Sequence, residues 1–148
     1  MRHMRIDPAE GPLNEPSAWA HGVSVRERMS WPAVTVAGGA PITEALQLMA
    51  LNRIHYLPVL DDGARLVGIV NADDVQSPRR SEGSPARTVA EIMSRPVVSI
   101  GSDAPLSEAM RVMASRHIGA LPVVDGERVI GILTQSDVVT ALGRQAWS

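Results

Sequence analysis

Two copies of one pattern make up most of this chain, and this internal repeat restricts the fold more than any other feature. Four phrases recur in the same order: VRERMSWPAVTV (25–36) with VAEIMSRPVVSI (89–100), APITEALQLMA (40–50) with APLSEAMRVMA (104–114), RIHYLPVLD (53–61) with HIGALPVVD (117–125), and GIVNADDV (68–75) with GILTQSDV (131–138). The shift between copies is 64 residues and becomes 63 after a deletion in the last turn. A unit of roughly 55 residues is marginal alone, so we expect the two copies to pack together about a pseudo-twofold axis.

The repeat divides the chain into five predicted segments. These are a loosely ordered N-terminal tail (1–23), a first repeat (24–77), a linker (78–87), a second repeat (88–143) and a C-terminal tail (144–148). The stretch between the repeats, QSPRRSEGSPAR, is rich in Pro, Ser, Gly and Arg, a composition typical of surface linkers. The N-terminal tail holds three Pro and two Gly without apolar periodicity.

Within each copy the pattern predicts the order β-α-β-β-α, and therefore an α/β fold. PVVSI (96–100), ALPVV (120–124) and RVIGIL (128–133) read as strands, the last two joined by a tight Asp125-Gly126 turn. Ser102 or Asp103 is a candidate cap for the helix that follows the first of these strands, with Pro105 in its first turn. Helical spacing predicts one apolar face in each copy: Ile42, Ala45, Leu46 and Met49, and Leu106, Ala109, Met110 and Met113.

Composition excludes several classes of protein. The chain of 148 residues has no Cys, which excludes disulfides and thiol catalysis and fits a reducing cytoplasm. Its net charge of −2, with acids and bases interspersed, gives no footprint for nucleic acid. Its apolar runs are far shorter than the roughly 18 to 20 residues of a spanning helix, and its N-terminus lacks a signal-peptide core. We therefore expect a cytoplasmic protein that does not bind membranes.

The step Thr134-x-x-Asp137, repeated as Asn71-x-x-Asp74, has two interpretations. It can be a capping box, in which a side-chain oxygen and an acid satisfy the first amides of a helix. It can also be a ligand site, because a helix N-terminus attracts phosphate and a carboxylate can accept hydrogen bonds from both hydroxyls of a ribose. The spacing alone favours the cap, although a cap would not require the glycine-led strand before the step or an acid retained in both copies.

Together the phrases V-x-E-x-M-S-x-P, A-P-x-x-E-A, L-P-V-V-D and G-h-x-[ST]-x-x-D resemble the cystathionine-beta-synthase-type (CBS) domain. They occur in order over about four fifths of the chain, twice, as in the tandem CBS pair called the Bateman module. The resemblance implies a disc-like pair with two clefts that bind adenosine nucleotides or related adenosyl ligands, each cleft shared between the copies.

Carried over residue by residue, the resemblance implies two sites. In the main site Asp137 would hold the ribose, with Thr134 and Ser136 near the phosphates. Its other members would be Ile132, Met29, Ala33, Val34, Ile54 and His55, with Ala33 and Val34 against the adenine. The second site would comprise Asn71, Asp74, Ile69, Met93, Val97, Val98, His117, Ile118 and Gly119, with Arg116 as a further candidate for its phosphates.

The two sites are expected to differ in affinity. Asn71 takes the place of Thr134, and Asp73 that of Ser136. A carboxylate near a phosphate is repulsive by about 1 kcal/mol at roughly 4 Å in bulk water, and more when desolvated. The main site should therefore bind anionic nucleotides better, and the second site should be empty or accept a less anionic adenosyl sulfonium compound.

The leading hypothesis is a non-enzymatic regulatory module. It would bind AMP, ADP, ATP or S-adenosylmethionine, report on cellular energy state, and signal to an unidentified regulated protein by conformational or oligomeric change. The alternative is a ligand-free interaction module that forms a homodimer through its helical faces, which carry Met49, Met110 and Met113. The sequence shows no nucleophile–base constellation, and its His residues (3, 21, 55 and 117) lack metal-ligand spacing, so neither hypothesis includes catalysis or a bound metal.

Overall fold

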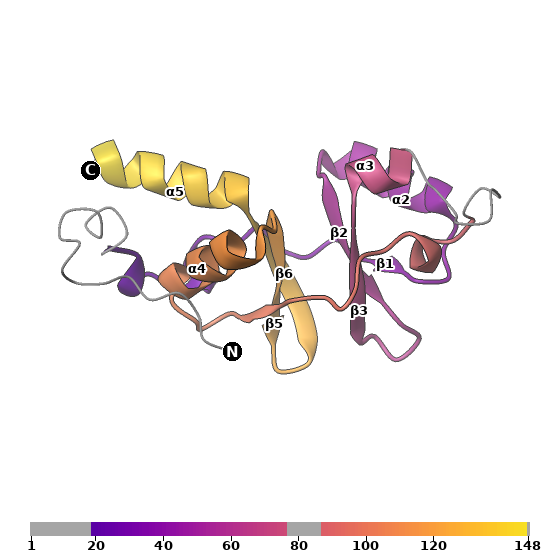
Figure 1. Cartoon of the computed structure of the whole chain (residues 1–148), viewed down its shortest axis with the longest axis horizontal. Coiled ribbons are helices and arrows are strands. Elements are labelled where there is room, and N and C mark those ends of the chain that lie inside the picture. Colours follow the sequence, from indigo (N-terminus) through magenta and orange to yellow (C-terminus); the bar gives the residue numbers. More distant parts are fainter. Residues whose placement is uncertain (1–18, 77–86, 148) are drawn as a thin grey trace. The chain divides into compact units, whose positions relative to one another are not determined.

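The computed structural model describes residues 19–76 and 87–147, in which the order β-α-β-β-α occurs twice (Figure 1). This confirms the predicted α/β class. The first set is β1 (Val36–Ala37), α2 (Ile42–Asn52), β2 (Tyr56–Leu60), β3 (Leu66–Asn71) and α3 (Ala72–Gln76). The second set is β4 (Ile100–Gly101), α4 (Leu106–Arg116), β5 (Ala120–Asp125), β6 (Arg128–Thr134) and α5 (Gln135–Trp147). Three short 3-10 turns complete the described chain: η2 (Trp19–His21), η3 (Val25–Glu27) and η4 (Val89–Glu91).

The chain divides into two compact units whose boundaries differ from those of the sequence repeats. Of the described residues, 19–31, 99–126 and 130–147 form one unit, named here the α5 unit. Residues 32–76, 87–98 and 127–129 form the other, named here the α2 unit. The leading segment of each repeat, residues 24–31 or 88–98, thus belongs to the unit that carries the body of the other repeat.

A three-stranded sheet in the order β1-β2-β3 forms the centre of the α2 unit. β1 runs parallel to β2, which pairs antiparallel with β3 and places Leu57 opposite Val70. The β2–β3 turn is closed by Asp61, whose Oδ1 accepts hydrogen bonds from the amides of Gly63 and Arg65, each at 2.9 Å. The buried core of this unit is aliphatic: Val36, Ala40, Ile42, Ala45, Met49, Leu57, Val59, Val70, Val75 and Val89.

The α5 unit repeats this sheet as β4-β5-β6, with β4 parallel to β5. β5 ends at Asp125 and β6 begins at Arg128, so the predicted Asp-Gly turn is confirmed. Gly126 has a φ of +64°, a left-handed conformation that glycine adopts without steric cost. Fully buried side chains of this unit include Val25, Leu106, Leu121, Val123 and Leu133.

Capping boxes shape both leading segments. The amide and hydroxyl of Ser24 donate to the Glu27 carboxylate at 2.9 and 3.1 Å. These bonds, the amide first, lower the pKa of Glu27. Thr88 and Glu91 form the equivalent box before η4. Each segment then joins its unit through backbone hydrogen bonds to the loop before the long helix, such as Val25 N–H to Ala104 O at 2.8 Å and Val89 N–H to Ala40 O at 2.9 Å.

The predicted cap of α4 by Ser102 or Asp103 is wrong. Pro105 occupies the N-cap position without a side-chain cap, just outside the helix rather than in its first turn. Both polar side chains bind Arg26 instead: its Nη2 donates to Ser102 Oγ at 2.8 Å and to Asp103 Oδ1 at 3.1 Å. Ser102 is almost fully buried, so this bond satisfies a hydroxyl that water does not reach.

Three predicted boundaries also differ from the structure. The strand predicted over 96–100 is reduced to Ile100–Gly101; Pro96, at its predicted start, has no amide to donate to a ladder. Helix α5 continues through Trp147, into the predicted C-terminal tail. Of the predicted N-terminal tail, η2 packs on α4 and the Val23 carbonyl accepts the Leu106 amide at 2.7 Å; residues 1–18 and most of the linker lie outside the described residues.

The predicted apolar helix faces are mostly confirmed. Their buried members are Ile42, Ala45, Met49, Leu106, Ala109 and Met113. Met110 is half-buried, and Leu46 is 37% exposed. No helix in the described part of the chain is both long and apolar enough to cross a membrane.

Candidate functional site

The Thr134–Asp137 step lies where β6 ends and α5 begins. The Thr134 amide donates to Asp137 Oδ2 at 2.9 Å, and the Asp137 amide donates to Thr134 Oγ1 at 3.2 Å. The two residues therefore form the reciprocal capping box that the sequence allowed. A carboxylate has about four lone-pair sites, so Asp137 keeps acceptor capacity for a ligand after this bond.

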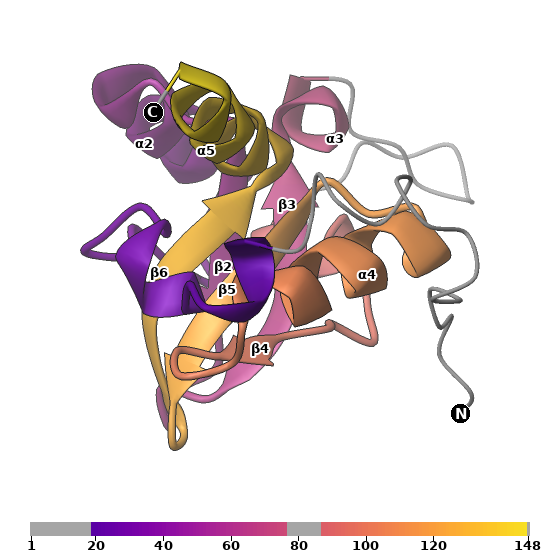
Figure 2. The same ribbon diagram turned by 90° about the vertical axis from the view of Figure 1, so that its left-hand side faces the viewer.

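Ser30 brings a further hydrogen bond to the same carboxylate. Its Oγ donates to Asp137 Oδ1 at 3.2 Å and lies 3.5 Å from Oδ2. Ser30 is held in place by a backbone bridge to Ile132, with N–H···O distances of 2.9 and 3.0 Å in the two directions. Figure 2 shows η2, in indigo, beside α4, and the leading segment that follows it, in purple, beside β6 of the same unit.

Met29 fills the space over the glycine of the GILT phrase. A Cβ atom on Gly131 would lie 2.7 Å from Met29 Sδ and 2.7 Å from the Ser30 carbonyl oxygen, so only glycine allows this approach. The structure thus places four predicted residues of the main site, Met29, Ile132, Thr134 and Asp137, around one strand end of the α5 unit. Ser136 is exposed in the first turn of α5.

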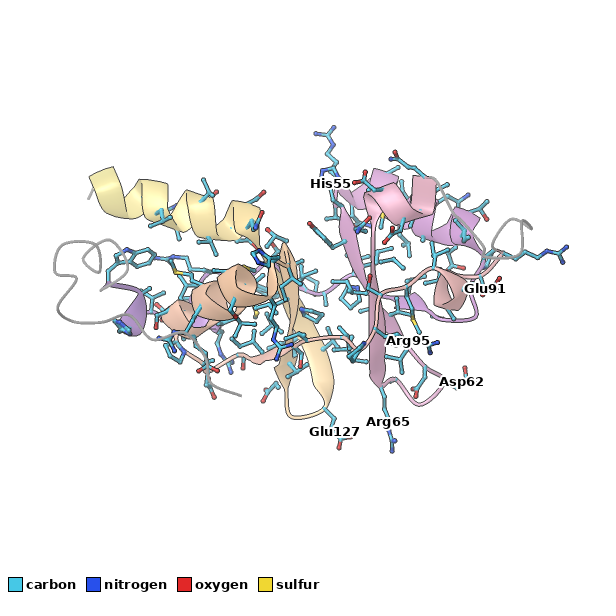
Figure 3. All side chains as sticks on the ribbon, viewed as in Figure 1. His55, Asp62, Arg65, Glu91, Arg95 and Glu127 are labelled. Carbon is cyan, nitrogen blue, oxygen red and sulfur yellow. The ribbon has the colours of Figure 1, made fainter. Side chains whose placement is uncertain are left out.

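The remaining predicted members of the main site belong to the α2 unit. Ala33 and Val34 precede β1, and Ile54 and His55 connect α2 to β2. The His55 carbonyl accepts the Ala72 amide at 2.8 Å, which places it at the start of α3 (Figure 3). The meeting of these four residues with Asp137 stays a prediction.

The second predicted site has the same backbone arrangement, but the carboxylate of its aspartate is hydrogen-bonded differently. The Asp74 amide donates to Asn71 Oδ1 at 2.8 Å, so Asn71 caps the short α3. Ser94 and Ile69 form the equivalent backbone bridge, at 2.8 and 3.2 Å, and Met93 lies against Gly68. Within the described ranges, the Asp74 carboxylate has no hydrogen-bond or salt-bridge partner.

Three residues predicted for the second site, His117, Ile118 and Gly119, lie in the α5 unit, whereas Val97 and Val98 lie in the α2 unit. The Gly119 carbonyl accepts the Gln135 amide at 3.0 Å, which repeats the bond between His55 and Ala72. In each unit the segment before L-P thus supports the start of that unit's own final helix. Whether His117, Ile118 and Gly119 also meet Asp74 stays a prediction.

Removing either cap side chain should cost about 1 kcal/mol of unfolding free energy, because the amide of the third helical residue loses its acceptor. We expect this loss for Thr134→Ala and Asn71→Ala in urea denaturation without ligand. Thr134→Ser keeps the hydroxyl and should leave stability nearly unchanged. Equal stability of Thr134→Ala and the wild type would contradict the capping geometry.

Among the described residues, no three His, Asp or Glu side chains are grouped to hold an ion, and the expectation that no metal is bound stays a prediction. His21 instead shares a hydrogen bond with Ser107, Nδ1 to Oγ at 3.0 Å; His3 lies outside the described residues.

Comparison with known proteins assigns the family. The CBS domain model matches residues 25–77 and 89–144. The chain is 31% identical over 116 residues to the CBS domain-containing protein YhcV of Bacillus subtilis, covering 78% of this chain and 82% of YhcV. It is also 31% identical over 120 residues to the L-aspartate semialdehyde sulfurtransferase of Methanocaldococcus jannaschii, covering 80% of this chain but 23% of that enzyme. The first curated relatives, enzymes, are thus matched over less than a quarter of their length.

Solved structures agree with this assignment. The CBS domain pair of protein MJ0100, in complex with 5-methylthioadenosine and S-adenosyl-L-methionine, is 30% identical, with a TM-score of 0.75 over 83% of this chain and 98% of that one. CBSX2 in complex with AMP is 26% identical, with a TM-score of 0.70 over 86% of this chain and 100% of that one. With two family matches in sequence and CBS pairs among its structural neighbours, this chain belongs to the CBS domain family as a tandem pair.

Proposed function

We propose that this chain is a regulatory module that binds an adenosyl ligand at the Thr134–Asp137 step. The observation that supports this most directly is the Asp137 carboxylate, fixed one turn inside the N-terminus of α5 with acceptor capacity remaining. Related CBS pairs solved with 5-methylthioadenosine, S-adenosyl-L-methionine or AMP share this fold. These ligands all contain the adenosine group. A carboxylate can accept one hydrogen bond from each of the two hydroxyls of its ribose.

Phosphate would add contacts at the same helix end. The first amides of α5 and the hydroxyls of Thr134 and Ser136 are donors, and the helix N-terminus carries partial positive charge. Glycine before the step keeps the strand backbone close to the Met29 segment and leaves no Cβ in the way. A response to AMP, ADP or ATP would let the module report on the adenylate energy state.

We further propose that the Asp74 site binds anionic ligands more weakly than the Asp137 site. Asp73 is exposed in the first turn of α3, where the other copy has Ser136. Its negative charge opposes a phosphate and favours an uncharged or cationic adenosyl compound. The main proposal is tested by a thermal-shift series with adenosyl ligands on the wild type and on Asp137→Ala.

An interaction role is a second candidate, because α2 exposes apolar side chains. Leu51 is 81% exposed and Leu46 is 37% exposed, whereas the positions equivalent to them on α4, Ser115 and Met110, are half-buried. We propose that α2 contributes to a homodimer. Both the ligand-binding and the ligand-free module can use such a dimer.

Leu51→Asp should convert this dimer to a monomer in sedimentation velocity, since a buried unpaired charge strongly opposes association. Ser115→Asp, at the equivalent position of α4, serves as a matched control and should leave the dimer intact. A monomeric wild type would exclude this use of α2.

A further inference from the structure

Ser30 is the one side chain from a leading segment that reaches an acid of the Thr/Asn-x-x-Asp steps in the described structure. Its Oγ donates to Asp137 Oδ1 at 3.2 Å, while the Thr134 amide donates to Oδ2 at 2.9 Å. Each oxygen of the carboxylate is therefore tied to a different donor. The orientation of the Asp137 side chain is fixed before any ligand arrives.

The repeat supplies an internal comparison. Ser94 aligns with Ser30, and its backbone bridge to Ile69 matches the bridge between Ser30 and Ile132. Yet in the described ranges neither the Ser94 hydroxyl nor any other group donates to the Asp74 carboxylate. The two copies thus share the backbone bridge, but only the Asp137 carboxylate accepts a hydrogen bond from the serine of that bridge.

We infer that Ser30 is a positioning residue for ligand binding at Asp137, and that it contributes to the difference in affinity between the two sites. This inference rests on the proposed function. A carboxylate that is already oriented loses less rotamer freedom when a ribose diol binds, so affinity rises without a new ligand contact. Ser30 belongs to the first repeat and Asp137 to the second. Ligand binding at Asp137 would therefore depend on the leading segment of the first repeat.

The test compares ligands with and without the diol. Dissociation constants for AMP and 2′,3′-dideoxy-AMP would be measured by calorimetry on the wild type, Ser30→Ala, Ser30→Thr, Ser94→Ala and Asp137→Ala. Ser30→Ala should weaken AMP binding by about two- to tenfold and leave dideoxy-AMP binding unchanged. Ser30→Thr keeps a hydroxyl and should restore AMP affinity, and Ser94→Ala should match the wild type.

Other results would overturn the inference in distinguishable ways. Equal weakening of both ligands by Ser30→Ala would show that Ser30 only supports the fold. Tighter AMP binding by that variant would show that its hydroxyl competes with the ribose. If none of the adenosyl ligands binds the wild type, or if the ligand binds the wild type and Asp137→Ala equally well, the proposed site itself is wrong and the role of Ser30 falls with it.

Discussion

Asp137→Ala should abolish the thermal stabilisation that an anionic adenosine nucleotide (AMP, ADP or ATP) gives this protein. A ligand at one hundred times its dissociation constant adds about 2.7 kcal/mol to the unfolding free energy of the wild type. The variant lacks the carboxylate that would accept the ribose hydroxyls, so its melting temperature should be the same with and without ligand. The measurement is a thermal-shift series with AMP, ADP, ATP, S-adenosylmethionine and 5′-methylthioadenosine.

The comparison must be made within each variant, because Asp137 also belongs to a cap. Removing its carboxylate leaves the Thr134 amide without its acceptor and should lower stability by about 1 kcal/mol regardless of ligand. Asp125→Ala is the matched control: it removes an exposed carboxylate at the other end of the β5–β6 hairpin and should keep the full ligand shift. A shift with AMP, ADP or ATP that survives in Asp137→Ala would place the nucleotide elsewhere, whereas a surviving shift with S-adenosylmethionine would point to the Asp74 site. No shift in the wild type with any of the ligands would favour the interaction module.

The repeated element order was predictable because local chemistry determines it. Apolar residues at helical spacing, β-rich runs and the Asp125-Gly126 turn each specify short-range structure, and both copies specify the same structure. The predicted helix cap was wrong because a residue distant in sequence binds the side chains that would have formed it. Ser102 and Asp103 are good cap residues, but Arg26, far away in sequence, binds both of them.

The repeat alone did not predict which unit each leading segment joins, although the resemblance to the CBS family had grouped Met29 with Asp137 and Met93 with Asp74. Alignment equates residues 25–36 with 89–100 but carries no information on which body each segment packs against. In the structure the first segment bonds to the loop before α4, and the second bonds to the loop before α2. This exchange brings Ser30 to Asp137, a contact that the alignment of Ser30 with Ser94 does not reveal.

The difference between Asp74 and Asp137 is a second feature that the sequence predicted only in part. The sequence predicted it from Asn71 and Asp73, which are visible as substitutions. The structure adds a second difference between the two acids: Ser30 donates a hydrogen bond to Asp137, and no group in the described residues donates one to the Asp74 carboxylate. Identical letters at equivalent positions, Ser and Asp in both copies, gave no sign of it.

Gly131→Ala should lower the unfolding free energy by about 1–3 kcal/mol, as expected for overpacking a close contact. The added Cβ would lie 2.7 Å from the Ser30 carbonyl oxygen, which cannot rotate away because it accepts the Ile132 amide at 3.0 Å. The Met29–Ser30 segment must therefore shift, and the bond from Ser30 to Asp137 with it. Urea denaturation measures the loss, and calorimetry with AMP should show weaker binding.

Alanine substitutions at two other glycines distinguish the overpacking at Gly131 from the general effect of adding a methyl group. Gly143, inside α5, has no atom within 4 Å of an added Cβ, so Gly143→Ala should stabilise the protein by about 0.5–1 kcal/mol. At Gly68 the nearest atoms all belong to the Met93 side chain, which can change rotamer, so Gly68→Ala should cost less than Gly131→Ala.

A double variant separates the two contacts of Gly131. Met29→Ala combined with Gly131→Ala would relieve only the contact with the Met29 side chain and leave that with the Ser30 carbonyl. If that double variant regained the stability of Met29→Ala alone, the side chain and not the Ser30 carbonyl would be what requires glycine at this strand.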